Sequence, residues 1–122
     1  FMSFCNEGEP SGSPPIGWCR WDRQTGELEV WRAPPQTFCE EVVVIPRPRE
    51  STDEGESAGE READKADVWI AAMMYDATRG VSGLAILDGD RIEAGPVCKL
   101  WLTNAVPHGL HGCFTPQVYG LD

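Results

Sequence analysis

The chain has 122 residues, with 10 Lys and Arg against 20 Asp and Glu, so its formal net charge is −10. That length fits one small domain or a piece of a larger one, and such an acidic chain is a poor binder of nucleic-acid phosphates or anionic membranes. No apolar run approaches the roughly 20 residues of a membrane-spanning helix, and the first residues lack the features of a signal peptide. Because the sequence begins at Phe1 rather than Met, we expect it to start inside a longer protein.

The N-terminal part predicts short strands joined by turns. After a Pro- and Gly-rich loop, the aromatic segment 16–22 and the alternating segment 27–32 are typical of two strands. Residues 23–26 between them end in a glycine, as turns that need a positive φ often do, so we predict a hairpin. The β-branched run 41–45 follows and predicts a strand buried on both faces.

Residues 50–67 differ from the rest of the chain. They hold eight acidic residues against two basic ones and no aromatic residue. Such a segment cannot bury enough apolar surface to fold, so we predict a disordered acidic insert at 50–67, with an acidic docking segment as the functional alternative. Most of the net negative charge therefore lies in this insert.

The remaining chain again alternates apolar runs with turns. The run 68–76 is also long enough for a helix, but the short turn before the strand-like run 81–88 favours a second hairpin. A further β segment is predicted at 96–102, and residues 112–119 close the pattern. Six or seven short strands without a convincing helix predict an all-β meander.

The five cysteines are an odd number without a Cys-x-x-Cys pair. A zinc ribbon needs paired close thiols, so a structural zinc site is not expected. Cys19, Cys39 and Cys98 lie in apolar or strand-like contexts, which predicts small, reduced core residues. Reduced cysteines favour an intracellular protein, in the cytoplasm or a plastid, over a secreted one.

The candidate site residues are few. The only histidines, His108 and His111, lie in a Pro- and Gly-rich turn that opposes a helix. In extended chain, residues three apart face opposite ways, so we expect at most one of the two to bind a given metal. Glu41 opens the β-branched strand, where a buried carboxylate would need a partner; an exposed acid at the strand start is the alternative. The Asp88-Gly89-Asp90 segment lacks the rest of a calcium loop and predicts a turn.

The order and spacing of these segments resemble the C-terminal part of the carotenoid cleavage oxygenases, a family that includes the lignostilbene dioxygenases and the retinoid isomerases of the retinal pigment epithelium. The resemblance covers residues 16–114, and its closing motif is the most specific. The motifs that carry it are Glu41-Val-Val-Val-Ile-Pro-Arg-Pro48, the acidic stretch, Val68–Asp76, Leu84-Ala-Ile-Leu-Asp88, Pro96-Val97 and Val106-Pro-His-Gly-Leu-His-Gly112.

The resemblance implies the C-terminal blades of a seven-bladed β-propeller, with residues 1–122 as a partial domain. That propeller carries Fe(II) on its axis, held by four histidines. His111 matches the last of these iron ligands, whereas His108 falls where the family has a non-ligand residue. Glu41 matches a glutamate that accepts an N–H from an iron-bound histidine and thereby fixes its ring. A shift of this assignment to Glu40 is the alternative, but Glu41 keeps the distance to Pro46 without a gap.

The implied activity is that of an Fe(II)-dependent dioxygenase, which cleaves a C=C bond of a carotenoid or apocarotenoid with O2. A retinoid-type isomerohydrolase of the same fold and a non-catalytic β-rich interaction domain are the alternatives. One imidazole cannot hold Fe(II), so we expect the 122-residue chain alone to be metal-free and inactive. Any peripheral membrane contact would be made by parts of the protein outside this chain.

Overall fold

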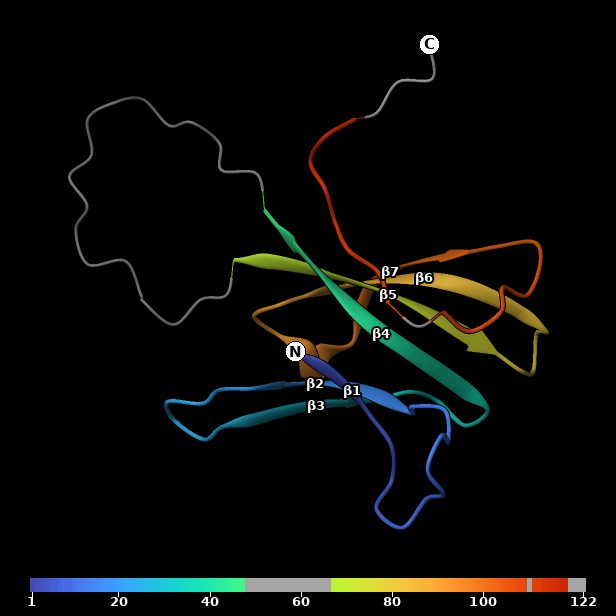
Figure 1. Cartoon of the computed structure of the whole chain (residues 1–122), viewed down its shortest axis with the longest axis horizontal. Helices are drawn as coiled ribbons and strands as arrows, with labels where there is room; N and C mark the ends of the chain where they lie inside the picture. The colour runs from blue at the N-terminus through green and yellow to red at the C-terminus, as the bar shows by residue number, and fades with distance from the viewer. Residues whose placement is uncertain (48–66, 110, 119–122) are drawn as a thin grey trace.

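The computed structural model describes residues 1–47, 67–109 and 111–118. Figure 1 shows two antiparallel sheets that face each other, one of three strands in the order β1-β2-β3 and one of four strands in the order β4-β5-β6-β7. The elements are β1 (Met2–Phe4), β2 (Gly17–Trp21), β3 (Leu28–Arg32), β4 (Thr37–Pro46), β5 (Val68–Asp76), β6 (Val81–Asp88), the 3-10 helix η1 (Ile92–Ala94) and β7 (Pro96–Trp101).

Consecutive strands are neighbours in both sheets, so each sheet is a meander of the kind found in a propeller blade. The predicted all-β meander is thus confirmed. The predicted insert at 50–67 lies outside the described residues except for Asp67. No helix in the described part of the chain is long and apolar enough to cross a membrane.

Both predicted hairpins are present, and an aspartate shapes each turn. In the β2–β3 turn, Asp22 accepts the N–H groups of Gln24 at 2.7 Å and Thr25 at 3.2 Å. In the β5–β6 turn, Asp76 accepts the N–H and the hydroxyl of Thr78. These turn hydrogen bonds, chiefly from Gln24 and from the Thr78 hydroxyl, hold the pKa of both carboxyls below its usual value. The segment 68–76 is therefore a strand, and its helical alternative is wrong.

The core lies between the two sheets. The Trp18 ring stacks on Trp31 with centroids 5.0 Å apart, and its indole N–H donates to the carbonyl of Glu40 in β4 at 2.9 Å. The backbone N–H of Cys39 donates to the carbonyl of Pro15 at 2.7 Å. These contacts tie β4 to the three-stranded sheet. The fully buried cluster consists of Trp18, Cys39, Ile70, Ala72, Met74, Ala85, Leu87 and Ile92.

Two burial predictions are wrong, both on edge strands. The β-branched run lies in β4, which begins at Thr37, and Val44 is 44% exposed, so this strand is not buried on both faces. Cys98 is exposed on β7, the opposite edge, although Cys19 and Cys39 are buried as predicted. An edge strand has a neighbour on one side only, so fewer groups cover its side chains. All five cysteines are free in the structure.

Four local features also differ from the sequence-based expectations. Residues 111–118 form no strand, whereas the short strand β1 was not predicted. The helix η1 was missed because a single turn of three residues leaves no periodic pattern. Glu41 lies inside β4 rather than at its start, and its side chain is half exposed.

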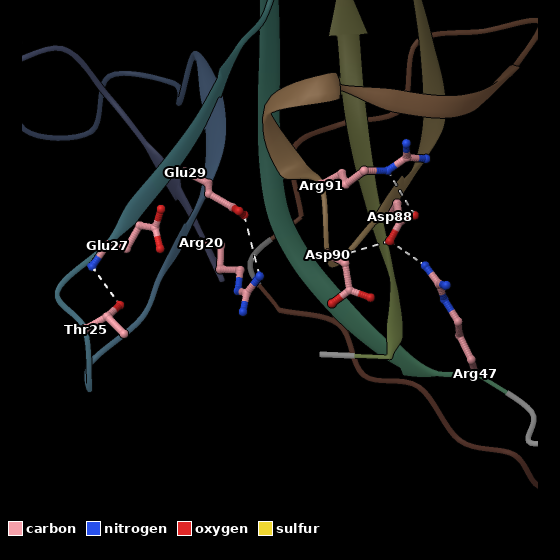
Figure 2. A network of polar contacts seen from close by, with 8 residues as sticks. All are labelled: Arg20, Thr25, Glu27, Glu29, Arg47, Asp88, Asp90 and Arg91. Carbon is pink, nitrogen blue, oxygen red and sulfur yellow. Dashed lines mark hydrogen bonds and ion pairs between the residues drawn. The ribbon is translucent and has the colours of Figure 1, made fainter. Parts of the chain in front are cut away.

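A polar network ties the ends of β4 and β6 together. Figure 2 shows Arg47 and Arg91 reaching Asp88 from two sides. The Arg47 guanidinium also lies 4.1 Å from the ring centroid of Trp69 in β5. Asp88 accepts the N–H of Asp90 at 3.0 Å, which confirms the turn predicted there. Burial raises the pKa of Asp88, but the Asp90 N–H and the Arg47 charge outweigh it and lower the pKa overall.

The Asp88 network predicts a pH dependence of stability. A carboxyl whose pKa is lowered by folding stabilises the native state above its unfolded pKa, and this contribution is lost as pH falls through the folded pKa. We expect Asp88→Asn to reduce the urea-derived free energy of unfolding at neutral pH and to flatten its decline between about pH 5 and 2. Glu7→Gln, at an exposed position, is the control. Parallel pH curves for the wild type and Asp88→Asn would contradict the role of the network.

The core predicts a large effect of truncation at Leu87, which is fully buried. Leu87→Ala should lower the free energy of unfolding by about 2–5 kcal/mol, because it removes apolar contacts and leaves a cavity. Leu87→Met keeps the volume and should cost less than about 1.5 kcal/mol. Chemical denaturation of the protein, followed by tryptophan fluorescence, measures both; a loss below about 0.5 kcal/mol in Leu87→Ala would place Leu87 outside the cooperative core.

Candidate functional site

A β-bulge in β4 determines where its two acidic side chains point. The pairing of β4 with β5 shifts by one residue between Cys39 and Val42, so Glu40 and Glu41 both stand opposite Met73. In a regular strand, consecutive side chains point to opposite faces of the sheet, but a bulge inserts one extra residue. Cys39 and Val42 on either side of it both pack toward the core. The two glutamates therefore share the other, outer face of the four-stranded sheet.

The chain that follows β7 returns along this sheet, and we name its residues 102–109 the strap. Ser82 in β6 fixes the first half of the strap by backbone and side-chain hydrogen bonds. Its carbonyl accepts the N–H of Leu102 at 2.9 Å, and its hydroxyl accepts the N–H of Val106 at 2.8 Å. Its own N–H donates to the carbonyl of Asn104 at 3.2 Å. A buried serine thus holds a segment without regular structure against the sheet.

Glu40 holds the end of the strap with both carboxylate oxygens. Oε1 lies 2.9 Å from Nδ1 of His108, and Oε2 accepts the backbone N–H of Gly109 at 3.0 Å. The Glu40 side chain is only 13% exposed, so little of it is left for water. Glu40 therefore binds the strap through the His108 side chain and through the Gly109 backbone.

Glu41 makes a separate contact with His111. Its Oε2 lies 2.9 Å from Nδ1 of the His111 ring. An ionised carboxylate only accepts hydrogen bonds, so Nδ1–H of His111 is the donor of this contact; in a neutral imidazole, that tautomer has a lone pair on Nε2. The side chain of His111 is 83% exposed, which leaves Nε2 accessible. A neutral imidazole oriented by a carboxylate is the usual form of a metal-binding histidine.

The donor set fits one ligand of a ferrous ion rather than a complete site. Within the described residues, no three His, Cys, Asp or Glu side chains come together as a metal site. The rings of His108 and His111 use different carboxylates and form two separate pairs. An Fe(II) site built from this chain therefore needs further ligands.

An apolar hollow of about 310 Å³ adjoins the Glu41–His111 pair on the outer face. Its apolar lining comes from β4, β5, β6 and the residues after His111: Val43, Ile45, Ala71, Met73, Leu84 and Phe114. Such a lining suits an uncharged, apolar occupant.

The structure brings together the two residues that the sequence singled out, His111 and Glu41. His111 contacts Glu41 and not Glu40, which was the alternative assignment one residue earlier. Their roles at a metal stay predictions. The contacts of Glu40 with His108 and Gly109 were missed. The sequence held one signal for these contacts: two adjacent acids and two nearby histidines. Because the bulge places both acids on one face, each acid contacts one histidine.

Comparisons with known proteins show what the chain is similar to. The family model described as retinal pigment epithelial membrane protein matches residues 2–116. The chain is 27% identical over 92 residues to the lignostilbene-alpha,beta-dioxygenase isozyme III of Sphingomonas paucimobilis, covering 75% of this chain and 16% of that protein. It is 25% identical over 97 residues to the isoeugenol monooxygenase of Pseudomonas nitroreducens, covering 80% and 18%.

A solved structure gives the same result for the fold. A mutant of the Synechocystis apocarotenoid oxygenase superposes with a TM-score of 0.66 at 27% identity, covering 84% of this chain and 19% of that one. The solved relatives are β-propellers, which confirms the predicted fold class. The chain spans less than a fifth of the length of each of these relatives.

The Glu41–His111 contact predicts one tautomer of the His111 ring. In metal-free, full-length protein with ¹⁵N-labelled histidine, near pH 8.5 and so about two units above the ordinary histidine pKa, the proton of His111 should reside on Nδ1. Glu41→Ala removes the acceptor, so His111 should exchange between both tautomers. His108 is the internal control, because its partner is Glu40 and its ring should not respond. A proton on Nε2 of His111 in the wild type would contradict the assignment.

Proposed function

The chain belongs to the retinal pigment epithelial membrane protein family, and from that membership we propose that the whole protein is an Fe(II)-dependent dioxygenase acting on a carotenoid or apocarotenoid. The reaction adds one O2 across a conjugated C=C bond, so that each carbon takes one oxygen atom and two carbonyl products form. Support comes from relatives that are oxygenases by name, one of them an apocarotenoid oxygenase and one a lignostilbene dioxygenase.

The single observation that carries the proposal is the Glu41–His111 pair. In the proposed site, Nε2 of His111 is one of the iron ligands, and the iron when bound supplies the activation of O2. Glu41 holds the ring in one orientation through the 2.9 Å contact at Nδ1, and it selects the tautomer that leaves Nε2 for the metal. Carboxylates in this position typically contribute 10–100-fold to metal affinity or activity, so roughly that much is expected from Glu41.

The hollow beside the pair supports an apolar substrate. The described lining includes Glu40 and Glu41 but no lysine or arginine, which disfavours a strongly anionic substrate. Carotenoids and apocarotenoids are long, largely uncharged polyenes, and binding them depends on burial of apolar surface. The lining of Val43, Met73 and Leu84 offers such surface next to His111.

Iron content of matched variants tests the metal assignment. In the full-length protein, His111→Ala should abolish both bound iron and cleavage, because it removes a ligand. His108→Ala, three residues away, should keep stoichiometric iron. Iron per protein is measured by mass spectrometry after purification without added chelator. Full iron and activity in His111→Ala would overturn the assignment.

Product analysis tests the substrate class. The iron-loaded protein is incubated with an apocarotenal, a carotenoid, a hydroxylated stilbene and a retinyl ester, in air and without O2. We expect two carbonyl products from a polyene, with consumption of one O2 per cleavage. Cleavage of the stilbene alone would shift the proposal to that substrate class. Conversion of the retinyl ester without O2 would indicate an isomerohydrolase, and absence of iron and turnover in the full-length protein would indicate an interaction domain.

A further inference from the structure

We propose that Glu40 is a positioning residue, which clamps the strap through His108 and Gly109 and thereby places His111 at the metal. This inference rests on the proposed function, since it assigns His111 to iron. It gives the second glutamate of the pair a role of its own. Glu41 orients the ring of His111, whereas Glu40 determines where the backbone that leads to His111 lies.

The clamp is anchored in the core. The carbonyl of Glu40 accepts the indole N–H of Trp18 at 2.9 Å, and Trp18 is fully buried between the sheets. The hydrogen bond from Trp18 therefore fixes the backbone from which the Glu40 side chain extends toward the strap. Because the carboxylate is 13% exposed and accepts from Gly109 and contacts His108, its own position is determined as well. The strap is thus connected to the core through one residue.

The part of the strap next to His111 has few other attachments. The last hydrogen bonds from Ser82 reach Val106. Among the described residues from Pro107 to His111, the hydrogen bonds to the sheet are those to Glu40 and Glu41. Gly109 carries no side chain to restrict its backbone, so the free segment would populate many conformations. Without the Glu40 clamp, His111 would rely on its own exposed contact with Glu41.

The bidentate contact also explains why both groups are used. The Gly109 N–H fixes a backbone position two residues before His111, and the His108 ring adds a second point that prevents rotation about the first. Hydrogen bonds to an ionised carboxylate are stronger than neutral ones. A ligand held in place before the metal arrives does not have to be ordered by the metal, so binding is tighter.

Four variants of the full-length protein test the clamp: Glu40→Ala, Glu40→Gln, His108→Ala and the double variant Glu40→Ala/His108→Ala. Hydrogen–deuterium exchange of the metal-free protein reports on the Gly109 amide, and competition with a chelator gives the iron dissociation constant. Glu93 is an exposed acid in η1, so Glu93→Ala controls for the loss of one negative charge. Thermal unfolding checks that each variant keeps its fold.

We expect Glu40→Ala to accelerate exchange at Gly109 and to raise the iron dissociation constant roughly 10–100-fold, as for other outer partners of metal ligands. Glu40→Gln keeps an acceptor oxygen and should restore part of the affinity. His108→Ala keeps the Gly109 bond and should bind iron more tightly than Glu40→Ala. The double variant should match Glu40→Ala, because His108 acts only through Glu40.

Unchanged exchange at Gly109 in a folded Glu40→Ala protein would overturn the clamp, whatever the iron content. Faster exchange with an unchanged iron dissociation constant would overturn its role in placing His111. If the wild-type protein binds no iron, the proposed function fails, and the exchange measurement still decides whether Glu40 holds the strap. An effect in Glu93→Ala equal to that in Glu40→Ala would reduce the result to general electrostatics and reject the proposal.

Discussion

The β-bulge in β4, a single extra residue, places the two carboxylates that contact the strap and His111 on the outer face of the sheet. Without the bulge, Glu40 and Glu41 would point to opposite faces, and one carboxylate would enter the core near Met74 and Ala72. Burial of an unpaired carboxylate is costly, so the acid pair and the bulge belong together. The bulge turns an unfavourable sequence for a regular strand into two acceptors that lie side by side on one face.

The two carboxylates depend in turn on how firmly β4 is held. Trp18 is stacked on Trp31 within the three-stranded sheet and donates a hydrogen bond to the backbone of β4. Lys99 of β7 lies over the other ring of this stack, 5.9 Å from the centroid of Trp31. The stack therefore connects both sheets, and Trp18 binds the backbone of Glu40, whose side chain lies on the opposite face of β4.

Much of the fold follows from sequence patterns, because apolar runs and turn residues act locally. The pairing of segments 68–76 and 81–88 was predictable in this way. Burial was less predictable: Cys98 looks like a core residue by its neighbours but lies on an edge strand, and strand order is a property of the whole sheet. The contact of His111 with Glu41 was expected from family resemblance. The role of Glu40 was not predicted, because two adjacent acids and two histidines do not show where the bulge lies or which acid contacts which histidine.

The open edge of β7 has a consequence for association with other molecules. Val97, Leu100 and Trp101 are exposed on this strand, and within the described part of the chain no strand pairs with its outer side. An uncovered apolar edge is a template for adding a strand from another molecule. A strand from elsewhere in the same protein that paired with β7 would cover this edge. Where the edge stays open, β7 is the strand on which intermolecular sheet would begin.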